Sequence, residues 1–359
     1  MEREKGKTKP RGKGKSWILP ALAICLVLAA VLGGSLYKKY YDHKVPNFTS
    51  TTELYVRPGD DMSSLRQYIL DSCSALNRKS LERALSEENV GDIPAGHYTI
   101  DRGCTSIYVA RMLSRGWQSP VKLVLSGTMR TKGSIARKIA NQMMVDSVDV
   151  AASLQDAQLL SSYGFTPSTV FSLFIPDTYE MYWTASVEDI LDRQKKAWDS
   201  FWTEENKKKA AQISLTPGQV SVLASIVEAE TNKPEEMPRI AGVYLNRLRK
   251  GMRLQADPTI AYILDYSVNR ILRRHLEIES PYNTYLHEGL PPGPICVPTK
   301  AALQAVLGPE KGDYLYFCAS ASFDGTHVFA KTLSEHNRNA AAYQKALSEY
   351  QRKKRGASK

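Results

Sequence analysis

Cysteine and histidine are scarce in this sequence, with five and six of them among 359 residues. So low a cysteine content excludes a small scaffold held together by disulfides. The histidines are scattered, no H-E-x-x-H pattern is present, and the cysteine spacings do not form a zinc site. We therefore expect neither a metal nor a cofactor. Cys73 and Cys104 lie in the same region, and a disulfide between them remains open.

The sequence also lacks the basic and aromatic residues interleaved on one face that a nucleic-acid-binding protein presents. Its formal net charge of +11 comes in good part from the two ends. Residues 1–16 hold seven Lys or Arg against two Glu, and residues 352–355 read RKKR. Basic tails beside a membrane meet anionic lipid or fix topology. We expect that role for residues 1–16 and 351–359, and no nucleic-acid partner.

One segment near the N-terminus, residues 17–37, carries no charged side chain. About 20 apolar residues suffice to cross a bilayer. The basic residues before this segment predict a cytoplasmic N-terminus, with everything after residue 37 outside the cytoplasmic membrane. A cleaved signal peptide fits less well, because its apolar part spans only about 7–15 residues and Leu36–Lys39 is a poor cleavage site. We therefore expect an uncleaved single-pass transmembrane helix.

The rest of the chain is long enough for two domains, and no repeat of fixed period is visible. Residues 38–162 read as a small membrane-proximal α+β region followed by a helical stretch, 134–160. A second α+β domain is expected from residue 163 to 350. Short strands and helices are predicted in the first region at residues 53–56, 60–70, 80–85, 93–100, 106–115 and 121–125.

A helix beginning near residue 216 carries the most informative pattern. Thr216 and Gln219 form a capping box, with Pro217 at the first helical position. Successive apolar residues then form one face, and Glu228 lies at its edge. Glu230 is expected on roughly the opposite side of the helix, because residues two apart do not face one another. An apolar wall raises the pKa of a carboxyl group and prepares it to donate a proton near neutral pH. From the residues alone, a surface ion pair is the commoner role for such a Glu.

The next helix is predicted from about Pro234 to Gly251 and contains Asn246 and Arg247. These two side chains either cap carbonyl groups and pair with Asp257, or contact substrate. Gln255 and Asp257 follow at once, on a strand or loop expected to fold back over Glu228.

Two later segments contribute further polar groups. Asn283 and Tyr285 lie in a loop suited to sugar hydroxyls, and the prolines at 291–294 are expected to keep the following loop rigid. A hairpin is predicted around residues 314–329. It contains His327, which is either a polar residue of the groove or a packed strand histidine.

The order and spacing of these segments, from about Phe174 to Tyr343, resemble the YceG-like family of membrane-anchored endolytic murein transglycosylases. Ile175–Tyr179 matches a family signature, although the Glu-Gly pair that often precedes it is Phe171–Ser172 here. The resemblance implies cleavage of MurNAc–GlcNAc bonds within nascent peptidoglycan strands to leave 1,6-anhydro-MurNAc ends, which terminates glycan elongation.

The resemblance also assigns roles to residues. It implies that Glu228 is the catalytic acid and that the polar residues around it bind substrate. These are Asn246, Arg247, Gln255, Asp257, Asn283, Tyr285 and His327. It further implies a LysM-like glycan-binding module within residues 38–162, and it makes peptidoglycan synthases candidate partners.

Two rival functions are considered. A serine acyl-enzyme is excluded, because the S-x-x-K match at Ser119–Lys122 runs into a strand and has no S-D-N or K-T-G partner. A non-enzymatic, membrane-anchored glycan-binding scaffold of the cell-wall synthesis machinery is the remaining alternative. It predicts loss of the acidic residue, whereas Glu228 and the pattern around it are present.

Overall fold

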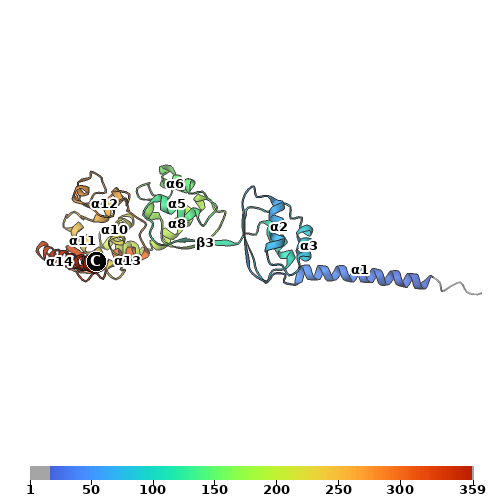
Figure 1. Ribbon diagram of the computed structural model, residues 1–359. Helices are drawn as coiled ribbons and strands as arrows, with labels where there is room; N and C mark the ends of the chain where they lie inside the picture. The colour runs from blue at the N-terminus through green and yellow to red at the C-terminus, as the bar shows by residue number, and fades with distance from the viewer. Residues whose placement is uncertain (1–16, 358–359) are drawn as a thin grey trace, which may run out of the picture. The chain divides into compact units, whose positions relative to one another are not determined.

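The computed structural model describes residues 17–357, and these divide into two compact units, up to Pro120 and from Val121 onward (Figure 1). The predicted cytoplasmic tail, residues 1–16, lies outside the described residues, as do residues 358–359. The class is mixed α+β, as predicted, with three separate two-stranded sheets among the described residues.

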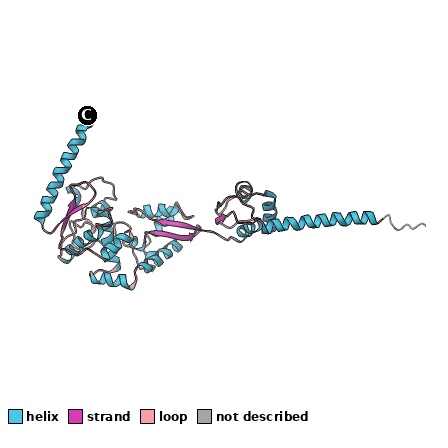
Figure 2. Ribbon diagram, turned by 90° about the horizontal axis from the view of Figure 1, so that it is seen from below, coloured by secondary structure: helices cyan, strands magenta, loops and turns pink. Residues whose placement is uncertain are grey.

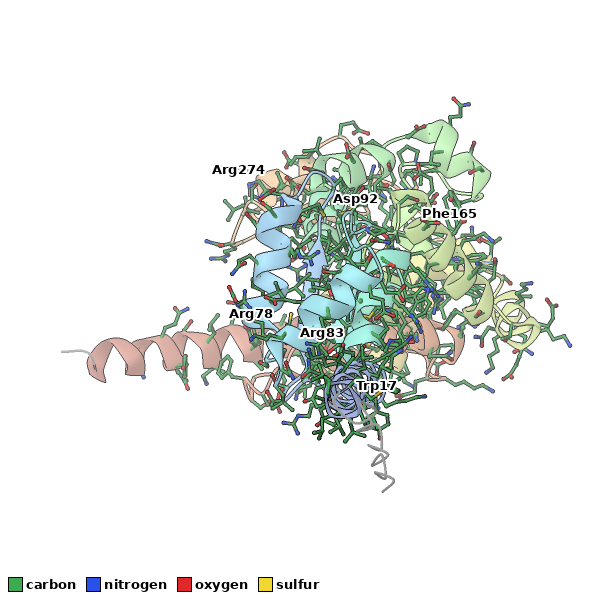
Figure 3. All side chains as sticks on the ribbon, turned by 90° about the vertical axis from the view of Figure 1, so that its right-hand side faces the viewer. Trp17, Arg78, Arg83, Asp92, Phe165 and Arg274 are labelled. Carbon is green, nitrogen blue, oxygen red and sulfur yellow. The ribbon has the colours of Figure 1, made fainter. Side chains whose placement is uncertain are left out.

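The first unit begins with the long apolar helix α1, Ile18–Lys44. Its apolar side chains are exposed over most of its length, and it is long and apolar enough to cross a membrane. The end of α1 is fixed to the rest of the unit by Asp42, which is buried. Arg83, labelled in Figure 3, donates to Asp42 from two guanidinium nitrogens at 2.8 and 2.6 Å. Ser80 donates to the same carboxylate at 2.5 Å.

After α1 the first unit follows the order strand, helix, helix, strand, helix. The elements are β1 (Thr52–Val56), α2 (Met62–Ser72), α3 (Arg78–Glu87), β2 (Gly96–Ile100) and α4 (Ser106–Arg115). β1 and β2 pair antiparallel. Asp61 caps α2 by accepting from the backbone N–H groups of Ser63 and Ser64, as its position before the helix predicts. Cys73 and Cys104 are free thiols, so the disulfide that the sequence left open is not formed.

The second unit starts with a layer of helices on a strand pair. β3 (Pro120–Leu125) pairs with β4 (Asp177–Tyr182), and between them come α5 (Lys132–Ala140), α6 (Ser147–Ser153), α7 (Ala157–Ser162) and the 3-10 helix η1 (Val170–Leu173). α8 (Val187–Phe201) completes this layer. All share one hydrophobic core. The sequence analysis set a boundary at residues 162 and 163, but β3 joins the later strand β4, so the second unit starts at Val121.

The remainder of the second unit surrounds α10 (Pro217–Glu230), which packs against α11 (Met237–Arg249), α12 (Asp257–Ile263) and α13 (Lys300–Leu307). α9 (Glu204–Gln212) and the 3-10 helix η2 (Arg273–Glu277) complete the helical part. The hairpin β5 (Tyr316–Ala319) and β6 (His327–Ala330) is antiparallel, as predicted. α14 (Leu333–Ala357) follows and extends away from the body of the unit (Figure 2). It continues into the predicted basic tail of residues 351–359.

Candidate active site

A pocket of about 440 Å³ in the second unit gathers most of the predicted polar residues. It is formed by the end of α10, by α11, by the segment entering α12, by the loop that carries Tyr285, by the β5–β6 hairpin and by the start of α14. Its ionisable and polar lining residues are Glu230, Tyr244, Arg247, Gln255, Asp257, Tyr285, Tyr316, Cys318, His327 and His336. Such a concave, partly apolar site with convergent polar groups is typical of an active site.

Glu230 is the carboxylate that faces this pocket. It is the last residue of α10, where the negative end of the helix dipole disfavours a second negative charge. The pKa of Glu230 is raised to about 7: burial is the main cause and the nearby charge of Asp257 adds to it, while the hydrogen bond from Tyr244 and the charge of Arg247 act in the opposite direction. Near neutral pH this carboxyl group therefore holds a proton in a large share of molecules, as a general acid requires.

Tyr244 fixes the orientation of Glu230. Its hydroxyl donates to Glu230 Oε1 at 2.5 Å across the interface between α11 and α10. The Tyr244 side chain is buried, and its ring meets that of Phe317 edge to face at 5.8 Å. Because Tyr244 is held by packing, it holds the carboxyl group in one direction. Sequence analysis did not single out Tyr244, because its bond to Glu230 forms only when α10 and α11 pack together.

Asp257 and Tyr285 form a second polar pair in the same pocket. The Tyr285 hydroxyl donates to Asp257 Oδ1 at 2.6 Å. Asp257 is the first residue of α12, not part of a strand or loop as expected, because Pro258 after it favours the start of a helix. Burial and the Asp257 charge raise the pKa of the Tyr285 phenol, so it remains a hydrogen-bond donor.

The segment between α11 and α12 is pinned to the Tyr285 loop by Thr284. Gln255 has φ of 51° and its N–H donates to the Thr284 carbonyl at 3.0 Å. The Thr284 hydroxyl accepts from the N–H of Ala256 at 3.0 Å and bonds the hydroxyl of Thr259 at 2.9 Å. A non-glycine residue with positive φ is uncommon and is held in place by such contacts. These bonds set the position of Gln255 and Asp257 in the pocket.

Arg247 is a buried cation that organises the wall of the pocket. Its guanidinium donates to the backbone carbonyls of Leu315 and Leu254, both at 2.7 Å, and lies over the ring of Tyr316 at 5.2 Å. It forms no ion pair with Asp257 among the described residues. The sequence left open whether Arg247 caps carbonyl groups or contacts substrate. These bonds show that it caps carbonyl groups, and it also lines the pocket.

The structure differs from the expectation for Glu228. This side chain is absent from the pocket lining. It accepts from the hydroxyl of Thr299, the N-cap residue of α13, and from the Thr299 N–H at 3.4 Å. The segment carrying Gln255 and Asp257 folds over Glu230 instead, because α11 and α12 pack on that side of α10. The two carboxylates lie apart on α10, as expected from helical geometry, and Glu230 is the one that lines the pocket.

Two other predicted site residues also lie outside the pocket lining. Asn283 is fully buried, donates to the carbonyls of Leu276 and Ile278, and accepts from the N–H of Tyr285. Asn246 donates to the carbonyls of Gly312 and Tyr314. Their amide groups are thus engaged with backbone, and they shape the loops that form the pocket.

His327 lines the pocket from β6 and is held by Glu236. Glu236 accepts from the His327 N–H at 2.8 Å and lies 3.1 Å from its Nδ1. Sequence analysis missed His336, which stacks on Tyr316 at 5.4 Å and lines the same pocket. Burial lowers the pKa of His336, with a further contribution from Arg247, so this ring is neutral near pH 7. Nothing in the sequence marked it beyond its place directly after Thr332 and Glu335, which bond to one another at the start of α14.

The proline-rich segment is packed closely against α10 and against the loop that precedes η1. A Cβ atom at Gly293 would lie 1.9 Å from the carbonyl oxygen of Ser168, so only glycine fits there. The N–H of Ile295 donates to the Ser225 hydroxyl of α10 at 3.0 Å. These contacts agree with the expectation that the segment is rigid.

Comparisons with known proteins agree on one family. A family model described as the YceG-like family matches residues 54–342. An endolytic murein transglycosylase of Bacillus subtilis (strain 168) is 30% identical over 332 residues, covering 87% of this chain and 91% of that protein. One of Streptococcus pneumoniae (strain ATCC BAA-255 / R6) is 27% identical over 289 residues, covering 71% of this chain and 52% of that protein.

A solved structure is similar as well. The crystal structure of a yceG-like protein from Listeria monocytogenes superposes with a TM-score of 0.54 at 28% sequence identity, covering 80% of this chain and 98% of that one.

Proposed function

Because the chain belongs to the YceG-like family, we propose that it is an endolytic murein transglycosylase, which cleaves the glycan strands of peptidoglycan between MurNAc and GlcNAc. The relative that it matches over nearly its whole length carries that name. The pocket supports the proposal independently, since it holds a carboxyl group whose raised pKa prepares it to donate a proton.

The observation that carries the mechanism is the environment of Glu230. We assign to Glu230, in place of Glu228, the role of general acid and then general base. The protonated carboxyl donates to the glycosidic oxygen as the bond to the anomeric carbon breaks. The 6-hydroxyl of the same muramic residue attacks that carbon and gives its proton to the carboxylate. The product carries a 1,6-anhydro end, and the carboxyl group is protonated again for the next cycle.

The other lining residues have supporting roles in this proposal. Gln255, Asp257, Tyr285 and His327 present hydrogen-bonding groups to sugar hydroxyls. Asp257 also contributes through its charge, because it helps to keep Glu230 protonated. Arg247, Asn246 and Asn283 hold the backbone that positions these groups.

A second chemical outcome is favoured by one specific observation, the presence of two carboxylates in one pocket. Hydrolysing glycosidases use a pair of acidic residues, one of which activates water or attacks the sugar. In that case Asp257 would be the second residue, and the product would carry a reducing muramic end.

Mass spectrometry of peptidoglycan digested with the full-length protein tests the proposal. We expect internal cuts that leave 1,6-anhydro-muramyl ends. Reducing muramic ends would assign the chemistry to hydrolysis with Asp257. The absence of any new end, with glycan still bound, would support the non-enzymatic scaffold instead.

The placement of the enzyme is also a proposal. α1 would anchor the chain in the cytoplasmic membrane, with residues 1–16 in the cytoplasm and both units outside, close to the strands made by peptidoglycan synthases. Protease added to the outer face of spheroplasts should digest both units and spare the N-terminal tail. Protection of the C-terminus would contradict this orientation.

The first unit is proposed to be a LysM-like glycan-binding module. The support is its strand–helix–helix–strand order, from β1 to β2. Full-length protein with Glu230→Gln should still sediment with insoluble peptidoglycan through this module. Loss of sedimentation in that variant would contradict the assignment.

A further inference from the structure

A second cavity, of about 480 Å³, lies in the second unit at the other end of α12 from Asp257. Its walls come from the turn between β3 and α5, from the end of α12, from the loop at residues 280–282 and from Phe171 of η1. Nothing in the proposed chemistry at Glu230 uses this cavity.

Two cations on the β3–α5 turn line this cavity without a carboxylate partner. Lys132 donates from Nζ to the neutral amide oxygen of Gln155 at 2.8 Å. Burial lowers the pKa of Lys132, and no acidic group offsets this. Arg130 is exposed and its guanidinium lies over the ring of Tyr266 at 5.1 Å. Asp265 also lines the cavity, yet among the described residues neither cation forms an ion pair.

Such an arrangement is unusual for a protein surface. Elsewhere in the described residues, Lys195 forms an ion pair with Asp199 and Arg239 forms one with Glu310. A partly buried lysine that has only a neutral partner pays a desolvation cost that a bound anion would offset. The two cations of the cavity therefore favour a negatively charged ligand.

Aromatic rings and hydroxyl groups form another part of the lining. The rings of Tyr262 and Tyr282 lie 4.7 Å apart at an angle of 42°. Burial raises the pKa of both phenols, so both stay protonated, and a hydrogen bond joins their hydroxyl groups. The hydroxyl of Ser280 lies beside them. An aromatic face with hydroxyl donors at its edge is suited to the apolar face and the polar rim of an organic ligand.

The cavity is joined to the Glu230 pocket by two short elements. α12 has seven residues and so spans about 10 Å. It carries Asp257 at its start and Tyr262 near its end. The loop that contributes Ser280 and Tyr282 to the cavity continues to Tyr285 in the pocket. A ligand bound at the pocket therefore has a second, charged site within the reach of its substituents.

We propose that this cavity binds a carboxylate of the peptide stem attached to muramic acid, and that the enzyme thereby prefers strands that still carry their peptides. The inference rests on the proposed function. Peptidoglycan sugars themselves carry no free carboxylate when the lactyl group is joined to a peptide, so the acidic groups near a cleaved bond belong to the stem. Arg130 and Lys132 would hold one such group by charge-assisted hydrogen bonds while Glu230 acts on the glycan.

The test uses the full-length protein on two substrates, glycan strands with peptide stems and strands whose stems have been removed by an amidase. Cleavage is followed by release of anhydro-muramyl ends. We expect the unmodified protein to have a KM about tenfold lower for strands with stems. The double variant Arg130→Gln/Lys132→Gln should lose this difference, with kcat little changed and with the rate on stripped strands unaffected. Lys208→Gln, an exposed lysine on α9, is the matched control and should behave like the unmodified protein.

Binding provides an independent readout. The inactive Glu230→Gln protein should bind strands with stems more tightly than stripped strands, and the double cavity variant in that background should bind both equally. Equal rates and equal affinities for the two substrates in the unmodified protein would overturn the proposal while leaving the proposed function intact. Absence of cleavage on both substrates would instead refute the proposed function. Weaker binding of the double variant to vesicles with anionic lipid, with unchanged selectivity between strands, would also overturn the proposal and identify a lipid-contact surface.

Discussion

Glu228 and Glu230 lie only two residues apart at the end of α10, but they face different surroundings on the two sides of the helix. Glu230 faces a pocket and has one phenol donor, a nearby negative charge and a pKa of about 7. Glu228 faces α13, where it accepts from a helix-capping threonine. Identical side chains on one helix thus acquire different chemistry from what packs against them.

Of the variants at the two carboxylates, Glu230→Gln is expected to cause the largest loss of activity. The amide keeps the shape and the bond from Tyr244 but has no transferable proton. A positioned general acid contributes about 10²–10⁴-fold, so product release should fall by that factor with glycan binding retained. The measurement is the rate of anhydro-end formation. Full activity of this variant would remove Glu230 from the mechanism.

The pH dependence of kcat/KM in the unmodified protein should report the titration of Glu230. kcat/KM should fall about tenfold per pH unit above pH 7, as the free enzyme loses the proton of Glu230. The free energy of unfolding should also fall as the pH rises. Because the pKa in the folded state lies above its ordinary value of 4.5, the contribution of this group is complete below about 4.5 and is lost as pH rises through 7. The melting temperature of Glu230→Gln, compared with that of the unmodified protein between pH 5 and 8, should lack this component.

Tyr285→Phe removes the hydrogen bond to Asp257 while keeping the ring. One hydrogen bond to a charged group corresponds to roughly tenfold, so we expect about that loss in kcat/KM and little change in fold. A loss as large as that of Glu230→Gln would mean that Asp257 takes part in the chemistry directly.

Tyr244→Phe should reduce the maximal rate less than Tyr285→Phe does. Its main effect should be a shift in the pH dependence of kcat/KM. The Tyr244 hydroxyl lowers the pKa of Glu230, so its removal should move the alkaline limb to higher pH. A profile that stays in place would show that another group sets this limb.

The smallest effect is expected on the other side of the helix. Glu228→Gln keeps an acceptor for Thr299, so activity should stay within about twofold and the free energy of unfolding should change by about 1 kcal/mol or less. A loss of activity comparable with that of Glu230→Gln, in a protein that melts normally, would restore Glu228 as the acid.

Local signals in the sequence predicted most of the elements. The capping box of Thr216 and Gln219, with Pro217 after the cap, starts α10 as expected, and α4 spans residues 106–115 as predicted. These features depend on neighbours in the chain. The choice between Glu228 and Glu230 depends on which face of α10 receives α11 and α12 and which receives α13, and no local pattern records that.

Contacts between distant parts of the chain also explain why Asn246 and Asn283 lie outside the pocket and why the second unit starts at Val121. Asn283 and Asn246 have side chains suited to sugars, but backbone carbonyls distant in sequence occupy their amides. The start of the second unit was missed because β3 pairs with β4, about fifty residues later in the chain. Long-range pairing of this kind is what a single sequence specifies least.

The hydrogen bonds from Arg83 and Ser80 to Asp42 limit how far the first unit can extend from the membrane. α1 has 27 residues and is about 40 Å long, whereas the hydrocarbon core of a bilayer is about 30 Å thick. With α1 spanning the membrane as proposed, its clamped end emerges close to the headgroups, and the first unit has no slack there on which to swing outward. The clamp would therefore confine the first unit to the zone directly above the bilayer.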